Sequence, residues 1–334
     1  MDAPLWTDTH APTLADLPQA DVRDRLRDAV DEPVNLVVYG PEGAGKTAAV
    51  RALADEAHAD PENDLVELNV ADFFGMTKKE VSEDPRFASF IDSKRRRNSS
   101  KADLINHVLK ESASYPPVSG DYNTIVLDNA EAIREDFQQA LRRVMERHHE
   151  ATQFVITTRQ PSKLIPPIHS RCFPVSVRAP TPDETVAVLR DIVEAEGVDH
   201  DEDGLEFVAG YAEGNLRKAI LGAQTTAEQA GEVTMNAAYE TLQDVGADDA
   251  VESMLDDAEA GDFTDARKTL DDLLVDEGMD GEEVLRELLD VGRSRYSGDE
   301  LAQLHRLAGD VEFDLTQGNS DRIQLGRLLA EFGR

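Results

Sequence analysis

The chain of 334 residues contains a single cysteine, Cys172, so it cannot form an internal disulfide bond. A lone cysteine is typical of proteins from a reducing compartment. No apolar run approaches the length that spans a membrane, and the first ten residues do not pair a basic segment with an apolar one as a secretory signal does. These absences predict a cytoplasmic protein that has no membrane partner.

Basic residues are also scarce, because 34 lysines and arginines stand against 68 acidic residues and leave a formal net charge of −34. The acidic residues are spread along the whole chain. Such charge can keep a chain disordered, but 40% hydrophobic residues with clear periodicity predict folded domains. A dispersed acidic surface suits a cytoplasm at very high salt, which indicates a halophile. At 1 M salt the Debye length is only about 3 Å, so the acidity does not exclude a nucleic-acid partner.

The first half of the chain alternates between strand-like and helix-like runs, which predicts an α/β fold with a parallel sheet wrapped by helices. The predicted strands are 35–39, 65–69, 124–128, 153–157 and 173–177. After residue 178 the strands stop. Thr181, Pro182 and Glu184 form a typical helix start, and Gly197 is a typical helix end. Helices are predicted at about 202–211 and 215–229, followed by a polar linker at about 230–250 and an all-helical block at 250–333.

The residues between the first predicted strand and the helix predicted at 47–58 fit the phosphate-binding pattern G-x-x-x-x-G-K-[ST]. The glycines let successive backbone N–H groups point at phosphate oxygens, and the helix N-terminus adds its partial positive charge. Lys46 is expected to reach the β- and γ-phosphates, and Thr47 to place a hydroxyl on Mg²⁺. The residues predicted to bind nucleotide here are Gly40, Pro41, Glu42, Gly43, Ala44, Gly45, Lys46 and Thr47.

A second acidic position follows the strand predicted at 124–128, where Asp128 is expected to hold the metal together with Thr47. In ring ATPases a glutamate comes next and deprotonates the attacking water. Here the next residue is Asn129, which can hold a water but cannot accept a proton at neutral pH. Glu131 is acidic but is expected to point elsewhere. Binding chemistry is therefore predicted, whereas hydrolysis is in doubt.

With these motifs the chain resembles the small subunits of archaeal replication factor C, a clamp-loader family of AAA+ ATPases, and a haloarchaeal member in particular. The resemblance is strongest between residues 36 and 217. The segments that carry it are 67–72, 128–131 in place of an Asp-Glu-Ala-Asp box, 139–146, 162–172 with Ser170, Arg171 and Cys172, and 214–219.

The resemblance implies a P-loop AAA+ domain at 1–178, a helical lid at 179–235 and an all-helical collar for oligomerisation at 236–334. It implies ATP and Mg²⁺ as cofactors. Arg171 would reach from this chain toward the γ-phosphate bound by a neighbour, and Arg217 would reach from the lid to this chain's own nucleotide. The implied partners are large and small clamp-loader subunits, a sliding clamp and primer–template DNA.

Three positions depart from the family pattern. Asn129 replaces the catalytic glutamate, Arg159 stands where the first sensor is usually an asparagine, and Ala11 replaces the arginine of a Tyr-Arg-Pro segment near the adenine. All three belong to this chain's own site, whereas Arg171, which would act on a neighbour, is kept. This asymmetry predicts a specialised subunit that binds ATP, supplies a finger in trans and hydrolyses its own ATP slowly or not at all.

Two other interpretations remain beside this one. The chain could be a fully active AAA+ motor in which Glu131 or Arg159 compensates for Asn129. It could also be an origin-recognition protein or another AAA+ protein that remodels nucleic acid, but the Ser-Arg-Cys match and the lack of a C-terminal helix-turn-helix pattern argue against that. The dense basic cluster Lys94, Arg95, Arg96 and Arg97 fits a contact with DNA or an acidic partner as well as it fits a solvated loop.

Overall fold

The structure is a computed structural model that describes residues 4–70, 76–83, 99–118, 120–243, 248–275, 279–316 and 320–333. The chain forms two compact units, Met1–Thr241 and Leu242–Arg334, which are described separately below. The basic cluster at 94–97 lies outside the described residues. Within the described ranges, no helix combines the length and the apolar character needed to cross a membrane.

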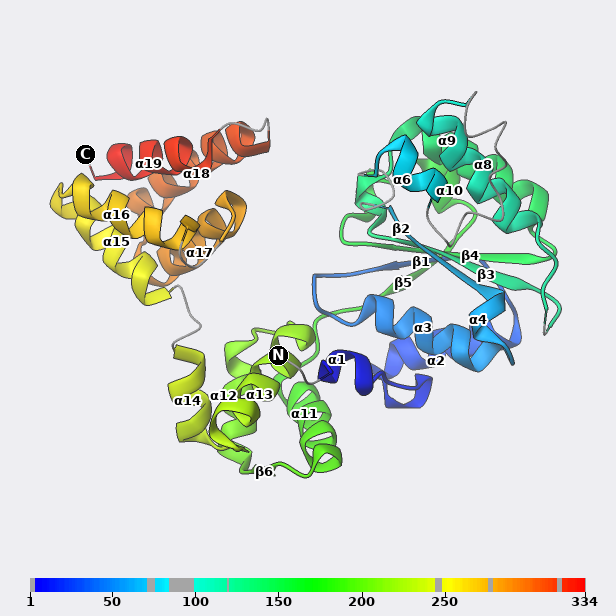
Figure 1. Ribbon diagram of the computed structural model, residues 1–334, viewed down its shortest axis with the longest axis horizontal. Coiled ribbons are helices and arrows are strands. Elements are labelled where there is room, and N and C mark those ends of the chain that lie inside the picture. The colour runs from blue at the N-terminus through cyan, green and yellow to red at the C-terminus, as the bar shows by residue number, and fades with distance from the viewer. Residues whose placement is uncertain are drawn as a thin grey trace. The chain divides into compact units, whose positions relative to one another are not determined.

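The first unit contains a five-stranded sheet with the strand order β2-β3-β4-β1-β5 (Figure 1). Every strand pair in this sheet is parallel. The strands are β1 (Leu36–Tyr39), β2 (Leu65–Asn69), β3 (Asn123–Asp128), β4 (Thr152–Thr158) and β5 (Phe173–Ser176). All five predicted strands are confirmed, with ends that differ by one residue at most. Because the sheet is parallel, the carboxyl ends of β3, β4 and β1 meet at one edge, where α/β proteins bind their ligands.

Helices cover both faces of this sheet (Figure 1). One layer consists of α2 (Ala20–Asp31), α3 (Lys46–Ala57) and α4 (Pro61–Asp64). The other consists of α6 (Lys78–Glu83), α8 (Lys101–Ser114), α9 (Glu135–His148) and α10 (Pro166–His169). Three short 3₁₀ turns lie between the larger elements at Leu14–Asp16, Ala130–Ala132 and Pro161–Lys163.

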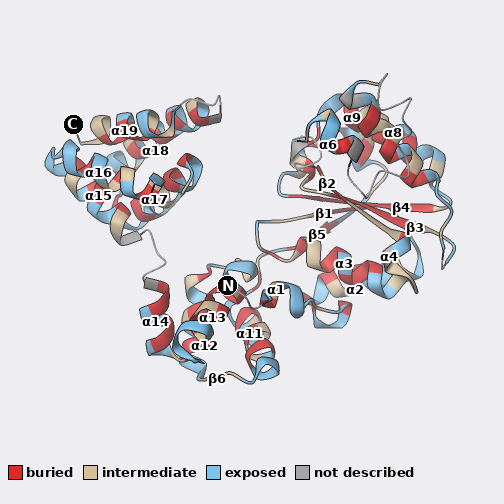
Figure 2. Cartoon of the chain, viewed as in Figure 1, coloured by how far each residue is buried: buried red, intermediate tan, exposed pale blue. Residues whose placement is uncertain are grey.

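The central strands are buried on both sides, as Figure 2 shows. All seven residues of β4 are buried. Successive residues of β1 belong to different cores: Leu36 and Val38 pack with α2 and α3, whereas Val37 packs with α8 and α9. Near-continuous apolar strands of this kind are expected of a parallel sheet between two helical layers.

Four helices follow the sheet and form the lid part of the first unit: α11 (Pro182–Glu196), α12 (Glu202–Tyr211), α13 (Leu216–Ala230) and α14 (Met235–Gln243). The predicted start and end of the first of these are confirmed. Thr181 Oγ1 accepts a hydrogen bond from Glu184 N, and Gly197 ends α11 in a left-handed conformation with φ 68°. Two short strands, β6 (Asp199–His200) and β7 (Glu232–Val233), pair between the helices.

The linker predicted at about 230–250 was wrong over much of its length. Helix α14 occupies this segment, with Ala238 and Leu242 buried and the ring of Tyr239 5.9 Å from that of Phe207. Few apolar residues in a polar stretch are enough here because they fall on one face of a short helix. Residues 244–247 lie outside the described ranges.

The N-terminal segment, with α1 (Trp6–Thr9), attaches to the lid. Trp6 is buried, and its backbone N–H donates to Gln224 Oε1 of α13 at 2.9 Å. His10 Nε2 lies 2.5 Å from Glu196 Oε1 at the end of α11. The N-terminal segment therefore connects to helices 186 and 218 residues later in the chain.

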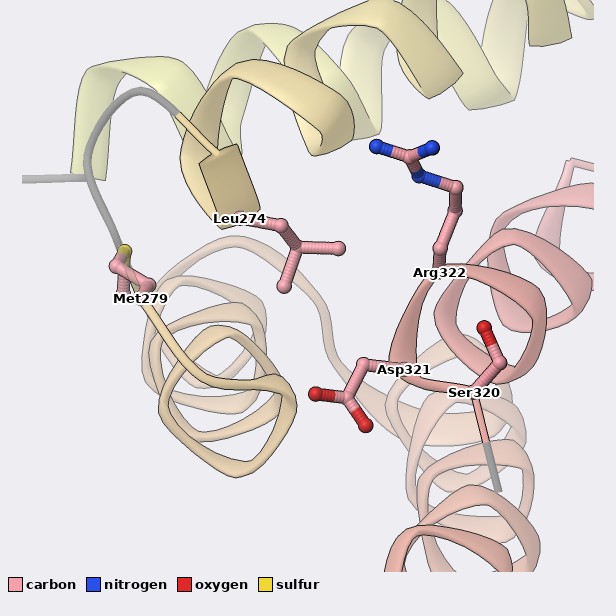
Figure 3. A pocket seen from close by; sticks show the side chains of 5 residues that line it. All are labelled: Leu274, Met279, Ser320, Asp321 and Arg322. Carbon is pink, nitrogen blue, oxygen red and sulfur yellow. The ribbon is translucent and has the colours of Figure 1, made fainter. Parts of the chain in front are cut away.

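The second unit consists of helices, as predicted: α15 (Asp248–Ala260), α16 (Phe263–Val275), α17 (Gly281–Arg295), α18 (Gly298–Thr316) and α19 (Asp321–Phe332). A cavity of about 430 Å³ in this unit is lined by Leu274, Met279, Ser320, Asp321 and Arg322 (Figure 3). The charged side chains that line it make contacts within the second unit. Asp321 Oδ2 accepts a hydrogen bond from Gly281 N at 3.2 Å, and Arg322 pairs with Asp271 at 2.7 Å. None of the predicted nucleotide-binding residues lines this cavity.

Candidate nucleotide-binding site

The predicted phosphate loop connects β1 to α3, as the strand–loop–helix pattern requires. Gly45 caps α3 with φ 93°, and Gly43 has φ 66°, which are conformations that favour glycine. A β-carbon on Gly43 would lie 1.8 Å from Asn215 Oδ1 of the lid. The left-handed backbone therefore favours glycine at both positions, and the contact with the lid excludes a side chain at Gly43.

The side chain of Lys46 folds back over this loop. Its Nζ donates to the carbonyl oxygens of Gly40 at 3.0 Å and Pro41 at 2.6 Å. Burial lowers the pKa of Lys46, while the charges of Glu131 and Asp128 act in the opposite direction. A phosphate is a stronger acceptor than these carbonyls because its hydrogen bonds are charge-assisted. The ammonium therefore fits the role of a phosphate ligand.

Asp128 and Thr47 are in direct contact, as the sequence predicted for a metal site. Thr47 Oγ1 donates to Asp128 Oδ1 at 3.1 Å, and Thr157 Oγ1 at the end of β4 donates to the same oxygen. A carboxylate beside a hydroxyl suits Mg²⁺, which prefers oxygen ligands and shares its coordination with phosphates and water. The sequence interpretation missed Thr157, which reaches Asp128 because β3 and β4 are neighbours in the sheet.

Asn129, at the position of the missing base, has a left-handed backbone conformation with φ 56° and ψ 49°. Its backbone N–H donates to Thr157 Oγ1 at 3.3 Å. Asparagine adopts this conformation more readily than most residues, so the backbone gives a structural reason for its presence. Glu213 also has a left-handed backbone conformation, with φ 50°. A glutamate can therefore adopt this conformation in this fold.

Glu131 does not point elsewhere, contrary to the expectation from sequence. Its carboxylate accepts hydrogen bonds from Thr158 Oγ1 at 3.0 Å, Arg159 N at 3.2 Å and Arg159 Nε at 2.7 Å. Burial alone would raise the pKa of Glu131, but the hydrogen bonds from Arg159, from backbone N–H groups and from Thr158 lower it below its ordinary value. The turn at 130–132 brings Glu131 back to the sheet edge, where it is a paired anion and a poor proton acceptor.

Arg159 also contacts the phosphate loop. Its Nη1 lies 2.7 Å from Glu42 Oε2, so one guanidinium joins Glu42 to Glu131. Both carboxylates raise the pKa of Arg159. The sequence placed Arg159 and Glu42 at the site but did not indicate that they pair with each other.

The lid rests on the phosphate loop through the start of α13. Leu216 N donates to Gly43 O at 3.0 Å, and Asn215 caps the helix by accepting from Lys218 N at 3.0 Å. Arg217, the predicted lid sensor, is one residue further along and is exposed. Its side chain has no hydrogen bond or ion pair with any residue that the structure describes, so its guanidinium is available to a ligand.

Arg171 follows α10 and is held on the surface of its own chain. Its Nη1 donates to Pro167 O at 2.8 Å, and its Nη2 pairs with Glu146 of α9. The side chain is 33% exposed. These partners do not belong to the phosphate-loop site. Beside it, burial raises the pKa of the Cys172 thiol to about 12, which makes this cysteine unreactive.

Gln19 supports the site although the sequence gave no signal for it. Its buried amide donates to Ala44 O in the phosphate loop at 3.2 Å and to Arg178 O at 2.9 Å. It thus ties the loop to the residues that lead from the sheet into the lid. Ala11, where the family has an arginine, is exposed.

Family models match this chain in three consecutive segments. The model of the ATPase family associated with various cellular activities (AAA) matches residues 36–180, and that of the RCF1/5-like AAA+ ATPase lid domain matches residues 187–227. The replication factor C C-terminal domain matches residues 247–331. Among solved structures, the RuvB Holliday junction branch migration motor of Thermotoga maritima is similar, with a TM-score of 0.51 and 14% identity over 81% of each chain. At that identity the likeness shows the fold alone.

Relatives of similar length extend the match to nearly the whole chain. The replication factor C small subunit of Halobacterium salinarum is 30% identical over 98% of this chain and 95% of its own. Those of Aeropyrum pernix and Archaeoglobus fulgidus are both 32% identical over 98% of this chain, and over 94% and 96% of their own. The chain has an AAA+ α/β fold with a helical lid and a C-terminal helical domain, and it belongs to the replication factor C small subunit family.

Proposed function

We propose that this chain is a specialised small subunit of a clamp loader, which places a sliding clamp on primed DNA during replication. It would bind ATP and Mg²⁺ at its own phosphate loop, supply Arg171 to a neighbouring subunit, and hydrolyse its own ATP weakly. The observation that carries this proposal is that Glu131, the acid beside the missing base, is tied to Arg159 and Thr158. Among the residues that the structure describes, the site thus keeps its binding groups, and the acid beside Asn129 is not a free base.

In this proposal each residue of the site has a defined task. Lys46 leaves the carbonyls of its own loop and binds the β- and γ-phosphates. Thr47 and Asp128 orient the metal ion, which neutralises charge on the phosphates. Asn129 can hold a water by its amide but cannot take its proton. Arg217 would bind the same nucleotide from the lid.

Arg171 would act on a nucleotide bound by a neighbour, because an arginine can stabilise the charge of a transferred phosphoryl group. Its contacts with Glu146 and Pro167 support a pre-oriented guanidinium at the surface. The collar at 236–334 would hold the ring, and the lid would span 179–235. The division between the two compact units falls after Thr241, six residues beyond the proposed end of the lid, so both boundaries fall within α14.

One observation supports the alternative that the chain is an active ATPase motor. Glu131 lies near enough to Lys46 to influence its pKa, so this carboxylate is at the site. If it served as the base, Glu131→Gln would abolish the ATPase activity of the isolated chain. If the chain is specialised as proposed, the same substitution acts on an activity that is already near background.

The role of Arg171 can be tested in an assembled complex. We expect Arg171→Ala to leave this chain's own affinity for ATP nearly unchanged and to abolish turnover at the neighbouring site, because an arginine finger is worth about 10³–10⁵ in kcat. Arg134→Ala is a matched control, since Arg134 is also exposed and pairs with an acidic side chain, Asp136. Loss of ATP binding by the isolated Arg171→Ala chain with full activity of the complex would contradict the role in trans.

The cluster Lys94, Arg95, Arg96 and Arg97 is the densest group of cations in the sequence and is proposed to contact DNA. If the protein works at very high salt, as its acidic composition predicts, counterion release would contribute little to binding. Replacement of all four by glutamine should therefore weaken clamp loading more at low salt than at high salt. Loading that does not change at any salt concentration would assign the cluster to a solvated loop.

A further inference from the structure

Arg159 has two carboxylate partners of very different character. Glu131 is nearly buried, with a side chain 10% exposed. Its carboxylate accepts hydrogen bonds from both the guanidinium and the backbone N–H of Arg159. Glu42 belongs to the phosphate loop, its side chain is 68% exposed, and it contacts Arg159 through Nη1 alone. Exposed ion pairs are weak because water competes with both partners and both side chains lose freedom. The contact with Glu42 is therefore the one that a competing anion would displace.

The same guanidinium lies within the electrostatic environment of the phosphate site. Arg159 and Glu42 both influence the pKa of Lys46, the ammonium expected to bind phosphate. Arg159 also follows β4 directly after Thr158, and the preceding residue Thr157 contacts Asp128. A terminal phosphate between Lys46 and the metal position would approach Arg159, and arginine binds phosphate oxygens through a planar fork of donors.

We propose that Glu42 is an internal competitor for Arg159, so that a nucleoside triphosphate must displace the Glu42 carboxylate before its terminal phosphate can bind the guanidinium. Glu131 keeps its contacts throughout and fixes the Arg159 side chain at the sheet edge. Glu42 thereby lowers the affinity for the triphosphate more than for the diphosphate, which lacks the terminal group. This inference rests on the proposed binding of ATP at the phosphate loop.

Titration of the full chain with ATP and with ADP, each with Mg²⁺, tests the proposal by a double-mutant cycle. We expect Glu42→Gln to tighten ATP binding about threefold, the scale of one exposed ion pair, and to change ADP binding less. In an Arg159→Gln background, Glu42→Gln should have no larger effect on ATP affinity than Glu56→Gln. The control Glu56→Gln removes an exposed acid on α3, outside the phosphate loop. Arg159→Met also removes the charge, with a long unbranched side chain, and replaces Arg159→Gln if that variant does not fold.

The outcomes separate the two proposals. If the wild-type chain binds neither nucleotide, the proposed function fails and this inference fails with it. If the wild-type chain binds ATP but Glu42→Gln leaves the ratio of ATP to ADP affinity unchanged, the inference alone is wrong. An equal effect of Glu42→Gln in the presence and absence of Arg159 would show that removal of a negative charge, and not release of Arg159, causes the change.

Discussion

The phosphate-loop site and the turn that carries Arg171 differ in what they keep. At the phosphate loop, Lys46 and the pair of Thr47 and Asp128 are in place, but the base position holds Asn129 and the adjacent acid is bound by Arg159. At the turn, Arg171 is intact and is held by a surface ion pair with Glu146, by the carbonyl of Pro167 and by the hydroxyl of Ser170. Under the proposed function, a subunit with these two regions would bind nucleotide for itself and contribute catalytic charge to another subunit. The comparison thus separates the proposed binding site from the proposed catalytic contribution within one chain.

The largest effect expected at the phosphate-loop site concerns the base position. We expect ATPase activity of the isolated wild-type chain to be near background, because loss of a general base typically lowers the rate by about 10²–10⁴. In an assembled complex, Asn129→Glu should raise turnover at this site, provided that a neighbour's arginine reaches it. Steady-state ATPase measurements on both forms check this.

Asn129→Gln is the matched control for that experiment. It imposes a similar cost of a left-handed backbone, about 1 kcal/mol, and supplies no carboxylate. Equal activity of the glutamate and glutamine variants would argue against the absence of a base as the cause of slow hydrolysis. Robust ATPase activity of the isolated wild-type chain would instead support the active motor.

Substitution of Lys46 tests the region that is intact. Lys46→Ala removes the only side-chain cation of the phosphate loop, so ATP binding should weaken by about 2–3 kcal/mol, the scale of a lost charge-assisted contact. A binding titration measures this, with Lys268→Ala in the second unit as a control for loss of an exposed lysine. Unchanged affinity for ATP in Lys46→Ala would refute the assignment of the loop.

Local patterns were enough to predict most of the fold and part of the site. The strands, the helix start at Thr181 and the phosphate loop depend on residues that are close in sequence, and all were found. Helix α14 was missed because its apolar face consists of few residues, such as Ala238 and Leu242, within a polar stretch. A face of so few apolar residues can be recognised only when the lid helices that it packs against are known.

The missed parts of the site have a common physical reason. Thr157 and Gln19 were not identified, and the direction of Glu131 was predicted wrongly. All three reach the site from different strands and turns, and their convergence depends on the order of strands in the sheet. A sequence pattern gives the type of a residue but not the direction of its side chain. The turn at 130–132, which returns Glu131 to Arg159, could not be read from the residue types alone.

The smallest expected effect lies where the sheet leads into the lid. Arg178 donates to both carboxylate oxygens of Glu184 at 2.6 Å, and Glu184 also caps α11 through Thr181. The hydrogen bond from Arg178, together with those from Thr181, holds the pKa of Glu184 at about 2, below its ordinary value of 4.5. Because the folded pKa is lowered, the pair stabilises the fold fully above pH 4.5, and the stabilisation disappears as the pH falls through about 2.

Glu184→Gln should therefore lower the free energy of unfolding by about 1 kcal/mol at pH 7, a modest value because the partners are partly exposed and solvent screens them. Thermal unfolding at pH 7, 4 and 2.5 checks this, and the difference between wild type and variant should shrink with decreasing pH. Asp183→Asn is the control, since Asp183 also lies in the first turn of α11 but does not pair with Arg178. If the difference in stability between wild type and Glu184→Gln stays constant down to pH 2.5, the packing of the Glu184 side chain, and not its charge, stabilises the start of the lid. Turnover at a neighbouring site, which Arg171 is proposed to support, should not change in either variant, because the partners of Arg171 within the described residues are Pro167, Ser170 and Glu146.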